Sequence, residues 1–304
     1  MKVFVAGATG AIGVPAVRAL VAAGHDVTGT TRRNSKRSVI ESLGARAVIV
    51  DALDAEAVSR AVDQTSPDAI VELLTALPKA PMRASDLDRT NTLRTTGTAN
   101  VIAAGRASGT TKLIVESIAF FYGSGSQIFT EEDPLPEHGL SMLQPARDAL
   151  REHERLAREA GGIVLRFGVF YGPETQSSRY IARMMRRRMM PLIDGGRGVL
   201  PWIHVDDAAA AVVAALDRGV PGESYNIVDD EPVSGRDALN AFADAARAPK
   251  PWSIPKWVAR IAAPYPAEFF TWHVRISNGK AKRTLGWTLR YPTIREGIQT
   301  LAGI

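Results

Sequence analysis

Three glycines near the start of the chain, Gly7, Gly10 and Gly13, restrict its fold more than any other feature. They follow a short apolar run at residues 2–6, which is typical of a buried strand, and they precede a helical pattern of apolar residues that ends at Gly24. In this order the first glycine permits a tight turn, the second lets the backbone approach a pyrophosphate, and the third lets the helix pack closely on the strand. The sequence therefore predicts a dinucleotide-binding turn, with a plain strand–helix turn as the alternative.

Strand-like and helix-like segments alternate after this turn. The expected strands lie at residues 2–6, 25–31, 46–50, 69–74, 112–116, 162–166 and 224–228, and a helix of good length is expected at 86–107. Such alternation is typical of a parallel sheet with helices on both faces. The sequence predicts an α/β fold, namely a Rossmann-type doubly wound parallel sheet with a smaller C-terminal α/β lobe.

The character of the sequence changes after Arg166, where glycine, proline and aromatic residues become denser. We expect residues 1–166 to form a dinucleotide-binding Rossmann domain, and residues 167–202 and 228–304 to form a smaller substrate-binding lobe. Residues 203–227 are expected to return to the first domain, so the boundary is not a single cut.

Composition excludes several classes of protein. The 304 residues contain no cysteine, which excludes disulfides and fits a reducing compartment. No apolar run is long enough to cross a bilayer and no signal peptide is visible, so we expect a cytoplasmic protein without a membrane partner. The five histidines lack ligand spacing, so no metal is expected. The net charge of +5 suits anionic ligands, and no motif supports nucleic-acid binding. Nothing indicates the oligomeric state.

Motifs spread over nearly the whole chain carry a family resemblance. They are GATGAIG at 7–13, Asp51, RTTGTANVIAA at 94–104, VESIAFFYG at 115–123, LRFGVFYGP at 165–173, IHVDDAAAA at 203–211, YNIVDDEP at 225–232 and KAKRTLGW at 280–287. In this order they resemble the short-chain dehydrogenase/reductase superfamily, in its extended or atypical branch of NAD-dependent epimerase/dehydratase-like proteins. The resemblance implies a nicotinamide dinucleotide at the glycine turn.

The turn and the resemblance together assign the cofactor contacts along the chain. We expect Gly7, Thr9, Gly10, Ala11, Ile12 and Gly13 at the pyrophosphate, Asp51 and Leu53 at the adenine, Leu74, Thr75 and Ala76 along the nicotinamide ribose, and Phe167 and Phe170 near the nicotinamide.

The end of the second strand indicates which cofactor is preferred. NAD-preferring sites carry an acidic residue there, which holds the ribose 2′-hydroxyl. In this chain the position falls on Thr31, and the basic residues that follow are Arg32, Arg33, Lys36 and Arg37. A 2′-phosphate would meet a hydroxyl and several cations. The sequence predicts NADP(H), with NAD(H) possible and an unselective basic loop as the alternative.

The superfamily's proton-transfer residues are missing from the positions where the resemblance puts them. Its reductases use a tyrosine, a lysine four residues later and a serine or threonine. Aligned on the helix around Glu154, the first two positions fall on Ala146 and Leu150, and residues 124–161 contain no tyrosine or lysine. The usual serine falls on Ile118, with Ser117 one place earlier. This departure argues against ordinary alcohol dehydrogenation and against sugar epimerisation or dehydration.

Ser117 and Tyr122 are the remaining catalytic candidates, with local hydrogen bonding and aromatic packing as their alternative roles. Hydride reduction of a simple ketone leaves an alkoxide, for which a general acid is worth ~10²–10⁴-fold. Reduction of a quinone or conjugated enone leaves a delocalised anion that one hydrogen-bond donor can serve.

We therefore expect an NAD(P)H-dependent oxidoreductase that acts on a conjugated carbonyl or quinone-like small molecule, apolar or aromatic, in secondary metabolism. A redox-inert NADP-binding sensor or regulatory protein, and a nucleotide-sugar epimerase/dehydratase-like enzyme, are the alternatives.

Overall fold

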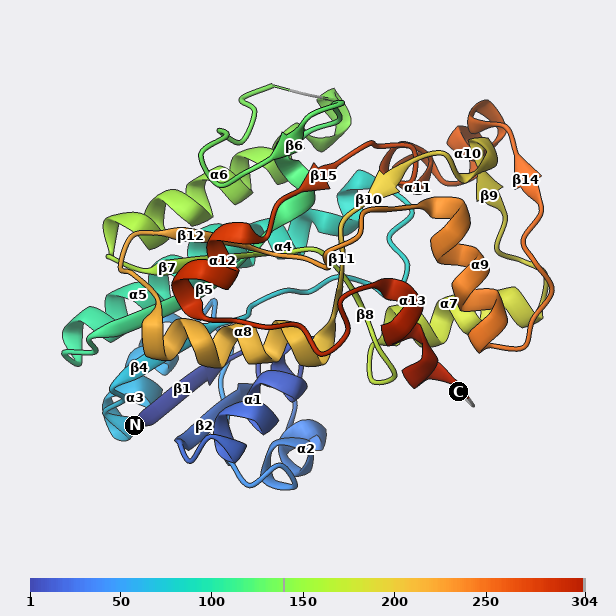
Figure 1. The fold of residues 1–304 in the computed structure, drawn as a ribbon. Coiled ribbons are helices and arrows are strands. Elements are labelled where there is room, and N and C mark those ends of the chain that lie inside the picture. Colours follow the sequence, from blue (N-terminus) through green and yellow to red (C-terminus); the bar gives the residue numbers. More distant parts are fainter. Residues whose placement is uncertain (139, 303–304) are drawn as a thin grey trace.

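A seven-stranded parallel sheet forms the centre of the computed structural model, which describes residues 1–138 and 140–302 (Figure 1). Its strands are β1 (Lys2–Ala6), β2 (Asp26–Thr31), β3 (Arg46–Ile49), β4 (Ala69–Glu72), β5 (Lys112–Ile118), β7 (Ile163–Phe167) and β12 (Ser224–Ile227). Their spatial order is β12-β7-β5-β4-β1-β2-β3. The predicted Rossmann-type α/β fold is confirmed, and all seven predicted strands are present in the sheet.

The order of the strands reverses between β1 and β4. β1 pairs with β2 on one side, with Val3 opposite Val27, and with β4 on the other, with Val3 opposite Ala69. Ligands of open parallel sheets bind at the carboxyl ends of the strands, at the point where the order reverses. The glycine turn follows β1 directly and therefore lies at this point.

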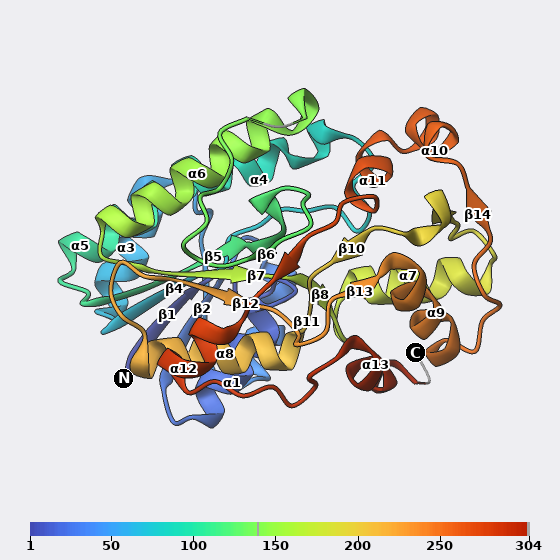
Figure 2. The ribbon, with the colours of Figure 1, turned by 45° about the horizontal axis from the view of Figure 1, so that its top comes forward.

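Helices cover both faces of the sheet (Figure 2). One face carries α1 (Gly13–Ala22), α2 (Arg37–Glu41), α8 (Val205–Arg218) and α12 (Gly279–Leu285), and the other carries α3 (Ala55–Thr65), α4 (Asp88–Thr92), α5 (Thr98–Ala107) and α6 (Gln144–Glu159). Alternate residues of β1 belong to the apolar cores on the two faces of the sheet. Val3 and Val5 pack against α1, whereas Phe4 and Ala6 pack on the opposite face. The sheet is therefore buried on both sides.

The helix predicted over residues 86–107 is not continuous. It consists of a 3₁₀ turn η2 (Ala84–Leu87), α4, a π-helical segment η3 (Leu93–Gly97) and α5. The wider π turn allows Arg94, Gly97 and Thr98 all to be buried, and Thr98 Oγ1 donates to the carbonyl of Leu93 five residues earlier. Tertiary contacts of these side chains, which no helical period predicts, explain the difference.

Short elements beyond the carboxyl ends of the strands form the rest of the molecule (Figure 1). They are β8 (Val169–Tyr171), α7 (Gln176–Arg186), β9 (Leu192–Ile193), β10 (Val199–Leu200), β11 (Trp202–His204), β13 (Val233–Ser234), α9 (Gly235–Ala245), β14 (Ser253–Ile254), α10 (Lys256–Ala262), α11 (Pro264–Phe269), α13 (Ile294–Gly297) and the 3₁₀ turn η7 (Ile298–Leu301), together with β6 (Ile128–Phe129), which pairs with β15 (Arg275–Ile276). We propose that most of them make up the smaller lobe, while β12 contributes to the main sheet.

A buried carboxyl group lies just after β12, where the chain leaves the sheet. Tyr171 Oη donates to Asp229 Oδ2 at 3.1 Å, and the backbone N–H of Asp229 donates to the carbonyl of Trp202. Burial, with the Asp207 carboxylate adding to it, raises the pKa of Asp229 to about 8, although the bond from Tyr171 opposes the shift.

This carboxyl group predicts a specific dependence of stability on pH. An unfolded aspartate has a pKa of about 4. Between about pH 4 and the folded pKa of Asp229, the folded protein holds a proton that the unfolded chain has released. The contribution of Asp229 to the free energy of unfolding therefore falls as pH rises, and it is constant above about pH 8. As pH rises across this window, the free energy of unfolding of Asp229→Asn should therefore increase relative to that of the wild type by about 1 kcal/mol per pH unit.

Urea unfolding at several pH values between 4 and 9 tests this expectation. Asp230→Asn, a change at the neighbouring exposed residue, is the matched control and should follow the wild type. Parallel stability curves for Asp229→Asn and the wild type would contradict the argument.

Candidate functional site

The glycine turn brings the ends of β1 and β4 and the start of α1 into close contact. Gly7 has φ of +89°, and a Cβ added there would lie 2.5 Å from the carbonyl oxygen of Leu73. A Cβ on Gly13 would lie 2.2 Å from the carbonyl oxygen of Gly7. The N–H of Gly10 donates to this same oxygen at 3.0 Å and closes the turn. Only glycine fits at residues 7 and 13.

The first turn of α1 can receive an anion. Ile12 is its N-cap and supplies no side-chain acceptor, and the first turn contains no acidic residue. The side chain of Ile12 is buried in the core, so only its backbone faces the turn, whereas Thr9 and Gly10 are half-buried and Ala11 is exposed. A helix N-terminus with free N–H groups and a positive dipole end suits a pyrophosphate. The residues present therefore fit the phosphates of a dinucleotide.

The predicted adenine side lies along β2 and β3. Thr31, at the end of β2, is buried, and its Oγ1 accepts the N–H of Arg33 at 3.3 Å. Arg32, Arg33 and Lys36 are exposed. Beyond β3, Asp51 Oδ1 accepts the N–H of Leu53 at 3.2 Å.

The predicted nicotinamide side lies at the ends of β4 and β7. Leu74 is buried, Thr75 is exposed and Ala76 is half-buried. Phe167 ends β7 with a buried ring, and half-buried Phe170 lies against it with ring centroids 5.3 Å apart. The two phenylalanines meet, but Phe170 is the more exposed.

The two catalytic candidates belong to one buried hydrogen-bonded network. Ser117 Oγ donates to Glu154 Oε1 at 2.6 Å, and Arg166 donates to both oxygens of Glu154, at 2.8 and 2.7 Å. Tyr122 Oη accepts from Arg166 and donates to Asn226 Oδ1 at 3.0 Å. Burial raises the pKa of Tyr122. Each hydroxyl proton is directed to a protein acceptor, and a catalytic role for Ser117 or Tyr122 stays a prediction.

The buried face of α6 is mixed, because Arg147, His153 and Glu154 lie among its apolar residues. Ala146 and Leu150 are 3% and 1% exposed and pack with aromatic rings that include Phe121 and Trp272. The half-buried residues around this aromatic cluster include Ile118, Phe120, Val169, Tyr265 and Phe270. Ile118 ends β5 and Val169 begins β8, so the cluster borders the ligand edge of the sheet. The side chains of this cluster that reach the ligand edge are therefore apolar and aromatic.

A second buried polar cluster was not predicted from the sequence. It contains Glu72 on β4, Arg94 on η3, Glu116 on β5 and His153 on α6. His153 Nε2 donates to the carbonyl of Glu116 at 2.6 Å, and Arg94 Nη2 lies 3.4 Å from Glu116 Oε1. Burial raises the pKa of Glu72 and lowers that of His153. The signal available in the sequence was an acid inside an otherwise apolar strand.

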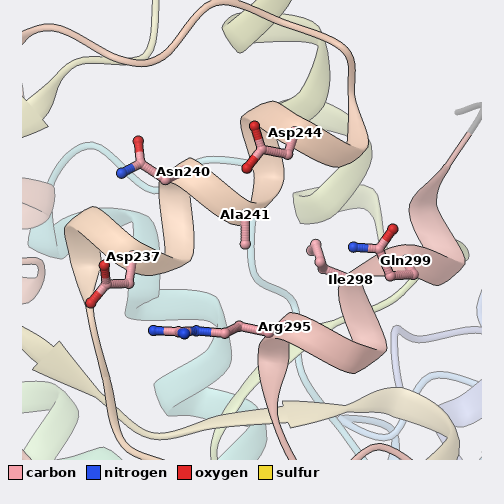
Figure 3. Close-up of a pocket in the computed structure, with 7 residues that line it drawn as sticks. All are labelled: Asp237, Asn240, Ala241, Asp244, Arg295, Ile298 and Gln299. Atoms are coloured by element: carbon pink, nitrogen blue, oxygen red, sulfur yellow. The ribbon is translucent and has the colours of Figure 1, made fainter.

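A hollow of about 380 Å³ lies elsewhere, between α9 and the C-terminal turns (Figure 3). Its lining residues are Asp237, Asn240, Ala241, Asp244, Arg295, Ile298 and Gln299. None of them is a predicted site residue, and none is aromatic. Within residues 1–138 and 140–302, no helix has the length and apolar character needed to cross a membrane.

Fold and turn define a dinucleotide-binding Rossmann protein, and comparison with known proteins identifies its family. The model of the NAD dependent epimerase/dehydratase family matches residues 3–228. The chain belongs to this family.

Two similar proteins are reductases of Streptomyces. The 3-diazoavenalumate denitrifying reductase of Streptomyces sp is 37% identical over 311 residues, covering 98% of this chain and 99% of that protein. The 2′-dehydrokanamycin reductase of Streptomyces kanamyceticus is 28% identical over 277 residues, covering 85% of this chain and 71% of that protein. The prediction of an oxidoreductase with a nicotinamide cofactor is confirmed at this level.

The fold is also that of a solved epimerase. The UDP-glucose 4-epimerase of Thermus thermophilus, in complex with NAD, superimposes with a TM-score of 0.82 at 22% identity, covering 100% of this chain and 99% of that one. At this identity the likeness concerns the fold alone.

Proposed function

We propose that this protein is an NADPH-dependent reductase of an aromatic diazo compound, or of another conjugated electrophile such as a quinone. The observation that carries the proposal is that Ala146 and Leu150 of α6, which we align with the superfamily's tyrosine and lysine, are apolar and buried. Bound reduced nicotinamide supplies a hydride. The substrate must therefore be one whose reduction does not depend on a proton from these two positions.

A diazo substrate meets this requirement. When a hydride replaces the nitrogen of an arenediazonium ion, the hydride brings the electron pair of the new C–H bond, and the pair of the old C–N bond leaves with N₂. No proton is taken up in this balance. The 37% identical relative is named for the reductive removal of nitrogen from a diazo compound, which supports the same chemistry here.

The protein's part in such a reaction is to bind and orient. The glycine turn and the N-terminus of α1 would hold the pyrophosphate, and the aromatic cluster beside Ile118 and Val169 would hold the ring of the substrate. The same apolar surface would exclude water from the bound substrate. Correct placement of hydride donor and acceptor supplies a large part of the rate in such a site.

A panel of electron acceptors tests the proposal. Purified protein with NADPH should reduce an arenediazonium salt or a quinone faster than the uncatalysed background, and should leave UDP-glucose and dTDP-glucose unchanged. Turnover of a nucleotide sugar in place of these acceptors would restore the epimerase or dehydratase alternative.

We also propose that NADPH is preferred to NADH. Thr31 replaces the acidic residue of NAD-preferring sites, and the exposed side chains of Arg32, Arg33 and Lys36 follow it. A charge-assisted hydrogen bond to a 2′-phosphate is worth about 1.5–3 kcal/mol, so NADPH should bind at least about tenfold more tightly.

Fluorescence titration of the wild type and of Arg33→Ala checks this preference. The variant should lose affinity for NADPH and keep its affinity for NADH. Arg46→Ala, which removes an exposed arginine that pairs with Asp26, is the matched control. Equal affinities of the wild type for the two cofactors would refute the preference.

A further inference from the structure

Two buried side chains hold the segment that follows β4. Glu72 Oε1 accepts the N–H of Leu74 at 2.9 Å, and Thr90 Oγ1 accepts the N–H of Ala76 at 3.1 Å. We propose that Glu72 and Thr90 are positioning residues for the nicotinamide half of the cofactor, because they fix the backbone on both sides of Thr75. The inference rests on the proposed function, in which residues 74–76 lie along the nicotinamide ribose.

Exposure along this segment supports the inference. Glu72 and Thr90 are both 0% exposed, whereas Thr75 between their two attachment points is exposed and Leu77 is 51% exposed. Glu72 and Thr90 therefore lie in the interior, and Thr75, which they hold between them, lies at the surface. Loops that bind ligands are held in this way by a rigid scaffold beneath them.

Stability alone does not account for Glu72. Burial raises its pKa well above the usual value, and its second oxygen, Oε2, has no hydrogen-bond partner although His153 Nε2 lies 3.6 Å away. A buried polar atom without a partner costs about 1–3 kcal/mol, and an apolar residue would pack in a central strand without that cost. Departures of this kind are expected where function requires a particular group.

His153 is itself held firmly in place. Its Nδ1 lies 2.8 Å from Thr98 Oγ1, in addition to the bond that Nε2 gives to the carbonyl of Glu116. Thr98 is as fully buried as Thr90 and belongs to the same helical run, but its hydroxyl bonds to Leu93 and His153 and not to the backbone of residues 74–76. The chain thus offers a matched pair of threonines, of which one holds the loop and the other holds the histidine.

The test compares three variants with two ligands. In Thr90→Val the shape is kept and the acceptor for Ala76 is lost, in Thr90→Ser the acceptor is kept, and Thr98→Val is the control. NADPH binding is followed by fluorescence and ADP binding by calorimetry, because ADP has the adenine half of the cofactor and lacks the nicotinamide half. Loss of one hydrogen bond that orients the loop should weaken NADPH binding about tenfold in Thr90→Val.

The expected pattern is selective. Thr90→Val should bind ADP as the wild type does, Thr90→Ser should recover NADPH binding, and Thr98→Val should bind both ligands normally while losing stability. Equal weakening by Thr90→Val and Thr98→Val, or equal weakening for NADPH and ADP, would overturn the inference and leave Thr90 a purely structural residue. If the wild type bound no NADPH, the proposed function would fail instead.

Glu72 is tested by the same two ligands. Glu72→Gln keeps an oxygen for the N–H of Leu74, whereas Glu72→Leu removes it. NADPH binding should be retained by the glutamine variant and weakened selectively by the leucine variant, and Glu116→Gln, in the same cluster but without a bond to the loop, is the control. A leucine variant that binds NADPH normally would contradict the role of Glu72.

Discussion

Replacing Gly10 with alanine is expected to weaken NADPH binding at least about a hundredfold while the protein remains folded. A Cβ at Gly10 would lie 3.2 Å from the carbonyl oxygen of Gly7 and 4.0 Å from the nitrogen of Gly13, so the protein can accept it with a small shift. The same methyl group would take up space at the residue where the motif needs a glycine, so that the pyrophosphate can approach the backbone. Binding is therefore lost without loss of the fold.

Gly13→Ala should fail in a different way. Its Cβ would lie 2.2 Å from the carbonyl oxygen of Gly7 and 2.8 Å from the carbonyl carbon of Ala8, so α1 must move away from β1. Overpacking of this kind typically costs about 1–3 kcal/mol, and here backbone atoms are involved, so we expect a loss of about 3 kcal/mol together with loss of binding.

Urea unfolding and NADPH titration of both variants separate the two effects. Gly235→Ala, at the start of α9, is the control because its added Cβ would have no neighbour closer than 3.5 Å. A Gly10→Ala protein that binds NADPH as tightly as the wild type would exclude the turn as the phosphate site.

The second large effect is expected at Arg166. Burial acts to raise the pKa of Glu154, but the bonds and charge of Arg166 outweigh burial, so this pKa lies below its usual value. Arg166→Leu leaves the carboxylate buried with only Arg158, which is partly exposed, as a charged partner. Breaking one side of a buried ion pair costs about 3–5 kcal/mol.

Two further variants of the chain test whether the loss comes from an unpaired buried charge. The double variant Glu154→Leu/Arg166→Leu should recover much of the lost stability, because no buried charge is then left alone. Arg155→Leu, which removes an exposed arginine paired with Glu152 and Glu159, should cost less than about 1 kcal/mol. The free energies of unfolding of these variants are measured by urea titration. An Arg166→Leu protein as stable as Arg155→Leu would show that the Glu154–Arg166 ion pair is not needed for stability.

The strands and the glycine turn could be predicted because local patterns determine them. Most strands of the sheet contain a short apolar run, and Gly13 is required by a contact with Gly7 in its own strand–turn–helix unit. Gly7 is required by its positive φ and also by Leu73, which follows the distant strand β4. The position of Ser117 and Tyr122 near the ends of β5 and η4 (Ala119–Tyr122) also followed from the order of the segments.

The direction of these side chains could not be predicted in the same way. Ser117 bonds to Glu154 on α6, and Tyr122 bonds to Asn226 on β12, at sequence separations of 37 and 104 residues. The π-helical turn at Leu93–Gly97 likewise depends on what Arg94 and Thr98 meet on α6 and β5. Pairings between distant segments leave no periodic trace in a single sequence, so the buried polar clusters became visible only in the folded chain.

The central claim is that this reductase acts on an acceptor whose reduction needs no proton donor from α6. It is tested most directly by comparing NADPH oxidation with an arenediazonium salt and with a methyl ketone on the same aromatic ring, after subtraction of the rate without protein. We predict that kcat/KM for the diazonium salt exceeds that for the ketone by at least about a hundredfold, the lower part of the range that a general acid supplies. With the Gly10→Ala variant, NADPH oxidation should be no faster than it is without protein. Comparable rates with the ketone, or a rate with the diazonium salt that survives in Gly10→Ala, would contradict the account.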